Sequence, residues 1–215
     1  MTTTLSEADS KALLGARGIR FADEYQAADA SGAVTAAASL GYPVAVKLCG
    51  DLISHKTERG LVRLGLLDAD AVSDASIALL AAARPEDGEV SLLVAPMITG
   101  ARELIAGIST DLQFGMTVMI GLGGILAEAI ADVAIRVAPI TEADAHEMLD
   151  DLSAQSLLGS FRGEPAVDRE AVVNILLALS SVAETVEGLV SVDLNPLIIS
   201  DGTPIAVDAL VEMEG

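Results

Sequence analysis

The chain has 215 residues, of which 32 are acidic and 12 are basic, so its formal net charge is −20. Such a chain lacks the basic surface that nucleic acids and anionic membranes require, so we expect neither as a partner. The apolar share of 52% excludes a disordered acidic tail. The single cysteine, Cys49, excludes a disulfide within the chain, and the N-terminal residues lack the basic and apolar regions of a signal peptide. The composition therefore predicts a soluble, cytoplasmic α/β protein.

Helix and strand patterns alternate along the first half of the chain. Apolar periodicity and turn residues predict helices at 5–18, 31–40 and 70–84, and strands at 44–48, 61–67 and 90–95. The strand at 44–48 places its valines and its leucine on one face. Lys47 is therefore expected to point away from the apolar face of this strand.

The second half of the chain also mixes strands and helices. The same reasoning predicts strands at 103–109, 117–120, 133–137, 189–194, 197–200 and 205–209, and helices that begin after Thr141 and Asp168. Asn195–Pro196 is expected to break the strand that precedes it. A seam between residues 95 and 101 separates two lobes, 1–95 and 96–215, of mixed α/β (α+β) structure. The lobes would face each other across a cleft, which is a preferred place for small ligands.

A basic segment interrupts the acidic chain. Between Lys47 and Arg63 there are four basic and two acidic side chains, and His55 lies among them. A local positive charge in so acidic a protein indicates an anion site, because the surrounding field would otherwise repel a phosphate. The alternative is that these are ordinary solvated charges beside a turn.

The C-terminal hairpin brings polar side chains together. If its turn spans 201–204, Leu197 lies opposite Asp208. Side chains alternate across a strand, so Asp193, Asn195 and Leu197 share one face, which Asp208 joins. Two carboxylates and an amide oxygen are hard ligands that suit Mg²⁺ shared with a substrate phosphate. The alternative is a solvent-exposed hairpin with polar outward positions.

Seven stretches of the sequence, taken in order and spacing, resemble the ATP-grasp domain of the ADP-forming acyl-CoA synthetases, more distantly related to the succinyl-CoA synthetase β subunit. They are GYPVAVKL at 41–48, SHKTERGLVRLGL at 54–66, VAPMITGARELIAG at 94–107, DLQFGMTVMIGLGGILAE at 111–128, DVAIRVAPITEADAHEM at 132–148, FRGEPAVD at 161–168 and VDLNPLII at 192–199. The resemblance implies a two-lobed ATP-grasp fold with ATP or ADP and Mg²⁺ as cofactors. It also implies the reaction acyl-CoA + ADP + phosphate ⇌ acid + CoA + ATP, with a histidine that carries the phosphoryl group.

The resemblance assigns roles to residues at matching positions. His55 corresponds to a second phosphoryl carrier, with Lys56 beside it as the other catalytic residue. Lys47 corresponds to the strand lysine that contacts nucleotide phosphates, and Asn195 and Asp208 to the magnesium ligands. The other residues expected at the nucleotide are the hinge Val94, Ala95, Pro96 and Met97, and then Glu103, Gly123, Gly124, Glu128, Arg136 and Asp193.

The sequence departs from the family pattern in two places. Arg59–Gly60 stands where a glycine pair is usual, so a side chain occupies a position at which the backbone would approach phosphate, although its guanidinium could itself bind phosphate. The stretch 109–115 lacks the two basic residues and the proline of the family. These departures keep open a nucleotide-binding regulatory or scaffold module that has lost catalysis. Another ATP-grasp carboxylate ligase, acting through an acyl phosphate, is the second alternative.

The family also implies a partner. Its members need a CoA-binding, Rossmann-like domain that carries the primary phosphohistidine, and this chain shows no glycine-rich signature for one. We therefore expect this chain to be a separate subunit that works with a CoA-binding α subunit, or a domain excised from a fusion with a CoA-binding domain. The active form is expected to be a hetero-oligomer.

Overall fold

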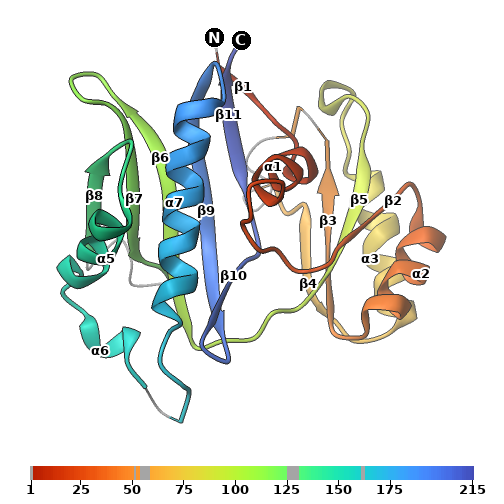
Figure 1. Cartoon of the computed structure of the whole chain (residues 1–215). Coiled ribbons are helices and arrows are strands. Elements are labelled where there is room, and N and C mark those ends of the chain that lie inside the picture. Colours follow the sequence, from red (N-terminus) through yellow and green to blue (C-terminus); the bar gives the residue numbers. More distant parts are fainter. Residues whose placement is uncertain (1, 51, 54–58, 125–130, 161–162) are drawn as a thin grey trace. The chain divides into compact units, whose positions relative to one another are not determined.

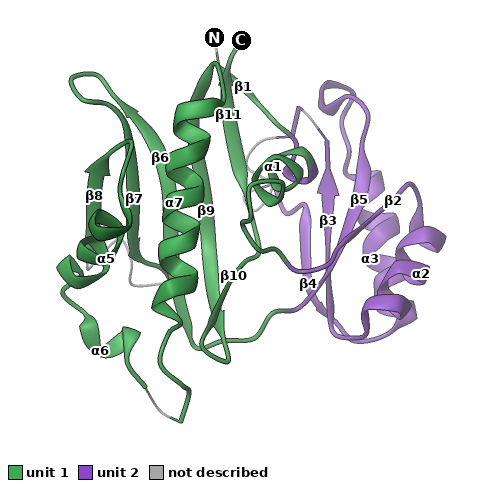
Figure 2. Ribbon diagram, in the orientation of Figure 1, with its two compact units in different colours: residues 1–5, 9–21, 98–215 green, residues 6–8, 22–97 purple. Residues whose placement is uncertain are grey.

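The computed structural model describes all residues of the chain except 1, 51, 54–58, 125–130 and 161–162 (Figure 1). Its residues form two compact units (Figure 2). Unit 1 comprises 1–5, 9–21 and 98–215, and unit 2 comprises 6–8 and 22–97. The chain passes between the units at 97–98, inside the predicted seam, but most of the N-terminal segment belongs with the C-terminal half.

The N-terminal segment joins unit 1 because its backbone pairs with the end of the chain. Strand β1 (Thr2–Thr4) pairs antiparallel with β11 (Leu210–Glu214), and the backbone N–H of Ala206 donates to the carbonyl of Arg20. Helix α1 (Glu7–Gly15) follows β1, and its buried Leu14 belongs to the core of unit 1. Long-range pairing of this kind leaves no signal in a local sequence pattern.

Unit 2 is built on an antiparallel sheet with the strand order β2–β5–β3–β4. Its elements are β2 (Tyr25–Ala27), α2 (Ala30–Leu40), β3 (Val44–Cys49), β4 (Val62–Leu66), α3 (Ala69–Ala81), a 3₁₀ helix (Pro85–Asp87) and β5 (Ser91–Pro96). Asp29 and Asp68 cap the two α-helices, since each side chain accepts a hydrogen bond from a first-turn N–H. The helices meet the apolar side of the sheet through small residues, including Ala33, Ala36 and Ala37.

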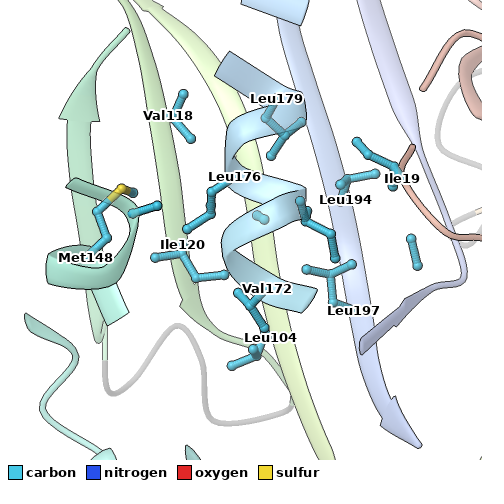
Figure 3. Packing of buried hydrophobic residues seen from close by; sticks show 14 of the residues in the cluster. Ile19, Leu104, Val118, Ile120, Met148, Val172, Leu176, Leu179, Leu194 and Leu197 are labelled. Carbon is cyan, nitrogen blue, oxygen red and sulfur yellow. The ribbon is translucent and has the colours of Figure 1, made fainter. Parts of the chain in front are cut away.

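Unit 1 is built on a larger sheet with the order β1–β11–β9–β6–β7–β8, in which β10 also pairs with β9. Besides β1, β11 and α1, its elements are β6 (Arg102–Asp111), β7 (Gly115–Leu122), β8 (Val133–Val137), α5 (Glu142–Asp151), α6 (Gln155–Leu158), α7 (Arg169–Thr185), β9 (Leu189–Ser200) and β10 (Thr203–Ala206). Helix α7 lies along the sheet, with Val172, Leu176 and Leu179 in the core (Figure 3). These positions recur at helical spacing, which turns one apolar stripe toward the strands.

The hairpin β9–β10 differs from its predicted register. Ser200 pairs with Thr203 and Leu197 with Ala206, so the prediction that Leu197 lies opposite Asp208 is wrong. The turn consists of two residues, Asp201 and Gly202, with φ angles of 48° and 81°. Asp-Gly favours this tight turn because both positions need a positive φ. Because the turn is shorter than the predicted four-residue turn, Leu197 pairs with Ala206 and not with Asp208.

Strand β9 is continuous through Asn195–Pro196, so the predicted break is wrong. Its ladder with β6 shifts between Leu104 and Ala106, opposite this dipeptide. A proline lacks the N–H that a regular ladder needs, and an irregularity in the pairing accommodates it. The strand continues because its neighbours hold it on both sides. In the described part of the chain, no helix has the length and apolarity needed to cross a bilayer.

Candidate functional site

Lys47 lies in the middle of the sheet of unit 2. Its backbone pairs with Leu93 on β5 and with Val62 on β4. Val46 and Leu48 on either side belong to the apolar core of the unit, whereas Lys47 does not, as the alternating pattern predicted. The side chain is nevertheless only 10% exposed, and its Nζ donates a 2.6 Å hydrogen bond to Oε1 of Glu7. The sequence analysis missed this buried partner.

The predicted hinge, Val94–Met97, continues from β5. Strand β2 pairs with β5 only as far as Val94, so the described pairing on that side stops there. On the other side, β3 pairs with Ala95 and Pro96, and the N–H of Met97 donates to the carbonyl of Pro43 at 3.0 Å. In the described structure, the hinge backbone after Val94 is therefore paired along one edge only, which suits a segment that recognises a ligand with its other edge.

Glu103 and the glycine pair come together in unit 1. The N–H of Gly123 donates to the carbonyl of Glu103 at 2.8 Å. A Cβ at Gly123 would lie 3.1 Å from backbone and side-chain atoms of Glu103, which is closer than such contacts usually are. Gly124 has a φ of 84°, a conformation that favours glycine. The packing thus requires these glycines beside the predicted acidic residue.

The predicted metal ligands gather where β9 changes partners. Strand β9 pairs with β10 from Leu197 onward and with β11 up to Asp193. Asn195, midway between them, therefore faces the corner between β10 and β11, where Asp208 lies. Asp208 is half-buried, and one of its carboxylate oxygens accepts a 2.9 Å hydrogen bond from the N–H of Ala209. Extending the registers of β10 and β11 along β9 places Asp208 opposite Asn195, whereas the predicted register placed it opposite Leu197.

Only part of the predicted polar face is present. Asp193 and Asn195 are exposed and Leu194 between them is buried, as alternation requires. Leu197 is also buried, so the prediction that it shares the face of Asp193 is wrong, because the irregularity at 195–196 reverses the alternation. Partial burial and then the charge of Asp208 raise the pKa of Asp193 above its ordinary value. The mutual repulsion of the two carboxylates is one that a divalent cation would relieve.

Arg136 is not part of this group. It lies on β8 opposite Val118, a buried residue on the helix-covered face of the sheet. Its guanidinium donates to Asp151 of α5 at 2.6 Å, and this hydrogen bond is the main reason that its pKa is raised. Arg136 therefore connects the edge strand β8 to helix α5. Asp193, by contrast, is exposed.

His55, Lys56 and Glu128 lie outside the described residues, so their roles remain predictions. Arg59, which follows the first two, is described. Its guanidinium donates two hydrogen bonds to Asp87, at 2.7 and 2.8 Å. The bond to Arg59, followed by one from the backbone of Arg84, lowers the pKa of Asp87 to about 2. The planar guanidinium of Arg59 thus binds the carboxylate of Asp87. The sequence pattern did not reveal this partner.

The pair Arg59–Asp87 should make the stability of the protein depend on pH. Folding lowers the pKa of Asp87 from 3.8 to about 2, so the ionised carboxylate stabilises the folded chain above pH 4. This contribution is lost as the pH falls toward 2. Urea unfolding of wild type and Asp87→Asn from pH 2 to 6 should therefore show a stability difference that is constant above pH 4 and shrinks below it. Glu86→Gln, at an exposed neighbour, should show little difference at any pH. A difference for Asp87→Asn that persists unchanged to pH 2 would contradict this assignment.

Unit 1 also contains an open cavity of about 520 Å³, which the sequence analysis did not predict. It is lined by residues 99–101, 163–165 and 199–201. The buried Arg102 donates to two of the lining residues, to the carboxylate of Glu164 and to the carbonyl of Pro165. One wall therefore belongs to the stretch at 161–168, one of the seven that carry the family resemblance. Arg102 anchors that wall to β6.

Comparison with known families matches residues 1–213 to the ATP-grasp domain. The β subunits of the ADP-forming acetate–CoA ligases II and I of Pyrococcus furiosus are each 34% identical to the chain. The alignments cover 99% and 95% of this chain and 93% and 90% of those subunits. The ADP-forming acetate–CoA ligase I of Archaeoglobus fulgidus is 33% identical over 94% of this chain, which corresponds to 30% of that longer protein.

Solved structures agree with these relatives. Acetyl-coenzyme A synthetase 1 of Candidatus Korarchaeum cryptofilum, in complex with coenzyme A, Ca-AMPCP and HgCl⁺, superposes with a TM-score of 0.89 at 31% identity. The match covers 98% of this chain and 93% of that one. The predicted mixed α/β ATP-grasp fold is confirmed, and so is the expectation of a subunit related to ADP-forming acid–CoA ligases. The chain therefore belongs to the ATP-grasp domain family and is a relative of the β subunits of ADP-forming acetate–CoA ligases.

Proposed function

We propose that this chain binds ADP or ATP with Mg²⁺ and exchanges a phosphoryl group with the nucleotide as the β subunit of an ADP-forming acyl-CoA synthetase. The observation that carries the proposal is the group formed by Asp193, Asn195 and Asp208. It offers two carboxylates and an amide oxygen at one corner of the sheet, where desolvation and then the charge of Asp208 raise the pKa of Asp193. Oxygen donors of this kind suit Mg²⁺.

Asn195 and Asp208 would hold the metal ion, with Asp193 nearby. When bound, Mg²⁺ neutralises charge on the nucleotide phosphates, which is a main contribution to catalysis in phosphoryl transfer. A solved relative, 32% identical to this chain, was crystallised with Mg-AMPPCP and coenzyme A. In that relative, a phosphohistidine segment points towards the nucleotide binding site. This arrangement in the relative supports the same chemistry here.

Other described residues supply the remaining contacts that we propose with the nucleotide. Lys47 supplies an ammonium group for phosphate oxygens from a strand that is paired on both sides. The hinge Val94–Met97 offers the backbone edge of Ala95, Pro96 and Met97 that β2 does not pair to the adenine. Glu103 offers its carboxylate, and Gly123 and Gly124 allow the backbone to approach a ligand closely because they carry no side chain.

The phosphoryl route is assigned to His55 from the family resemblance. The imidazole takes the phosphoryl group from a phosphohistidine of the partner, so that one N–P bond breaks as another forms. The phosphoryl group then passes to a terminal oxygen of ADP, with loss of the second N–P bond and formation of an O–P bond in ATP. Lys56 stabilises the negative charge of the carried group. The partner is a CoA-binding subunit or domain that carries the first histidine.

The proposal predicts that the isolated chain binds nucleotide but does not consume acyl-CoA. Titration calorimetry with ADP and Mg²⁺ should show saturable binding below millimolar concentration. Purified chain supplied with acetyl-CoA, ADP and phosphate should form no ATP, because it lacks the CoA-binding partner. Absence of nucleotide binding at millimolar concentration would overturn the first part, and sustained ATP formation by the chain alone would overturn the second. Binding that persists while the complex with the partner stays inactive would favour a regulatory module instead.

A further inference from the structure

The side chain of Glu7, the first residue of α1, is fully buried. Its Oε1 accepts the 2.6 Å hydrogen bond from Nζ of Lys47. Residues 6–8 belong to unit 2, so both members of the pair lie within one compact unit. A carboxylate is costly to bury unless a cation compensates its charge, which explains why this glutamate is placed against a lysine.

We propose that Glu7 is an internal counter-ion that competes with the nucleotide phosphates for the ammonium group of Lys47 and thereby weakens nucleotide binding. This inference rests on the proposed function, in which Lys47 contacts the phosphates. Glu7 thus tunes the affinity of the site for the nucleotide phosphates without touching the nucleotide itself.

The geometry makes the competition direct. The backbone of Lys47 is held by strands on both sides, so only its side chain can adapt to a ligand. An ammonium group has three N–H donors, and one of them is committed to Glu7. A phosphate oxygen bonded to the same nitrogen would lie within a few ångströms of the Glu7 carboxylate. Like charges at that separation repel strongly where solvent is largely excluded.

Glu7→Gln separates this effect from simple positioning of the lysine. Glutamine has nearly the size of glutamate and keeps a carbonyl oxygen that accepts the hydrogen bond. A bond from the ammonium to a neutral amide oxygen is weaker than one to a carboxylate, which loosens the hold on Lys47. The substitution also removes a full negative charge beside the phosphates. We expect the second effect to dominate, because the acceptor stays in place while the repulsion disappears.

The test is a double-mutant cycle read by calorimetry with Mg–ADP. Wild type, Glu7→Gln, Lys47→Met and the double variant are compared, with Asp70→Asn as the matched control. Asp70 is an exposed first-turn acid on α3 of the same unit. Adenosine, which has no phosphates, is measured by displacement of ADP. Urea unfolding of each variant reports stability separately.

We expect Glu7→Gln to bind Mg–ADP at least fivefold more tightly than wild type, with no change for adenosine. The gain should vanish in the Lys47→Met background, and Asp70→Asn should bind like wild type. If Glu7→Gln binds ADP equally or more weakly while Lys47→Met weakens it, the counter-ion role is wrong although Lys47 still contacts phosphate. If Lys47→Met leaves ADP affinity unchanged, the proposed role of Lys47 fails instead.

A measurement on wild type decides the matter if Glu7→Gln does not fold. Crystal structures with and without Mg–ADP should show Nζ of Lys47 bonded to Glu7 in the free protein. With nucleotide bound, this distance should lengthen as the ammonium turns to a phosphate oxygen. An unchanged Lys47–Glu7 bond in both structures, with no contact to phosphate, would overturn the inference.

Discussion

Asp208→Asn is expected to weaken the binding of ADP at least tenfold in the presence of Mg²⁺ and less than twofold in the presence of EDTA. Asp208 lies opposite Asn195 at the corner of the hairpin, and its charge helps to raise the pKa of Asp193. Removing one of two negative charges leaves a poorer site for a hard dication. A tenfold loss corresponds to about 1.4 kcal/mol of binding free energy.

Asn195→Ala should behave in the same way, because it removes an oxygen donor from the same group. Calorimetric titrations of both variants with ADP, in magnesium and in EDTA, measure the effect. Asp201→Asn provides the control, since Asp201 is an exposed acid in the turn of the same hairpin. If the loss of affinity is equal with and without metal, these residues contact the nucleotide in another way and the magnesium assignment is wrong.

His55→Ala is expected to abolish ATP formation by the complex with the CoA-binding partner and to leave nucleotide affinity within about twofold of wild type. The imidazole is the proposed carrier of the phosphoryl group, and alanine offers no nucleophile at that position. ATP formation from acetyl-CoA, ADP and phosphate, and calorimetry with Mg–ADP, provide the two measurements. His146→Ala is the matched control, because the other histidine lies on α5, and it should retain full activity.

A His55→Ala complex that still forms ATP within a few-fold of the wild-type rate would show that the phosphoryl group reaches ADP without this residue. Another ATP-grasp ligase mechanism, through an acyl phosphate, would then be favoured. Loss of nucleotide binding in the same variant would instead show that His55 belongs to the binding site.

Local sequence patterns predicted the elements well where local chemistry decides the structure. The strand at 133–137 has the predicted bounds, and Thr141 caps α5 through a reciprocal pair of hydrogen bonds with Asp144. The cap of α7 at Asp168 was also predicted, because a side chain that accepts a first-turn N–H marks a helix start. Such signals lie within three or four residues of one another.

The errors concern interactions between distant positions. The hairpin register depended on turn geometry, and a four-residue turn was assumed where Asp201–Gly202 forms a two-residue turn. The acidic partners of Lys47 and Arg59 were also not predicted. Lys47 and Glu7 are 40 residues apart, and Arg59 and Asp87 are 28 apart. Charge patterns along the chain identified these cations but could not choose their partners among 32 acidic residues.

The hairpin that carries the predicted metal ligands shows how a wrong register arises. The register that placed Asp208 near Asn195 was incorrect, and so was the placement of Leu197 on their face. The group forms because β9 passes from β11 to β10 at that point. Two sheet partners meet on one strand there, and the connection 207–209 between them carries Asp208 past Asn195. This feature could not be read from alternation alone.

The pairing of β1 with β11 has a consequence for the order in which parts of the protein fold during synthesis. All residues of unit 2 leave the ribosome before residue 98 does, so that unit can close while translation continues. Thr2–Thr4, by contrast, must wait for Leu210–Glu214 before they can enter their sheet. Strand β1, which is made before unit 2, is thus placed after it. Nascent chains stalled far enough beyond Met97 for all of unit 2 to have left the ribosome should protect β3 from proteolysis while the N-terminal strand is still cleaved.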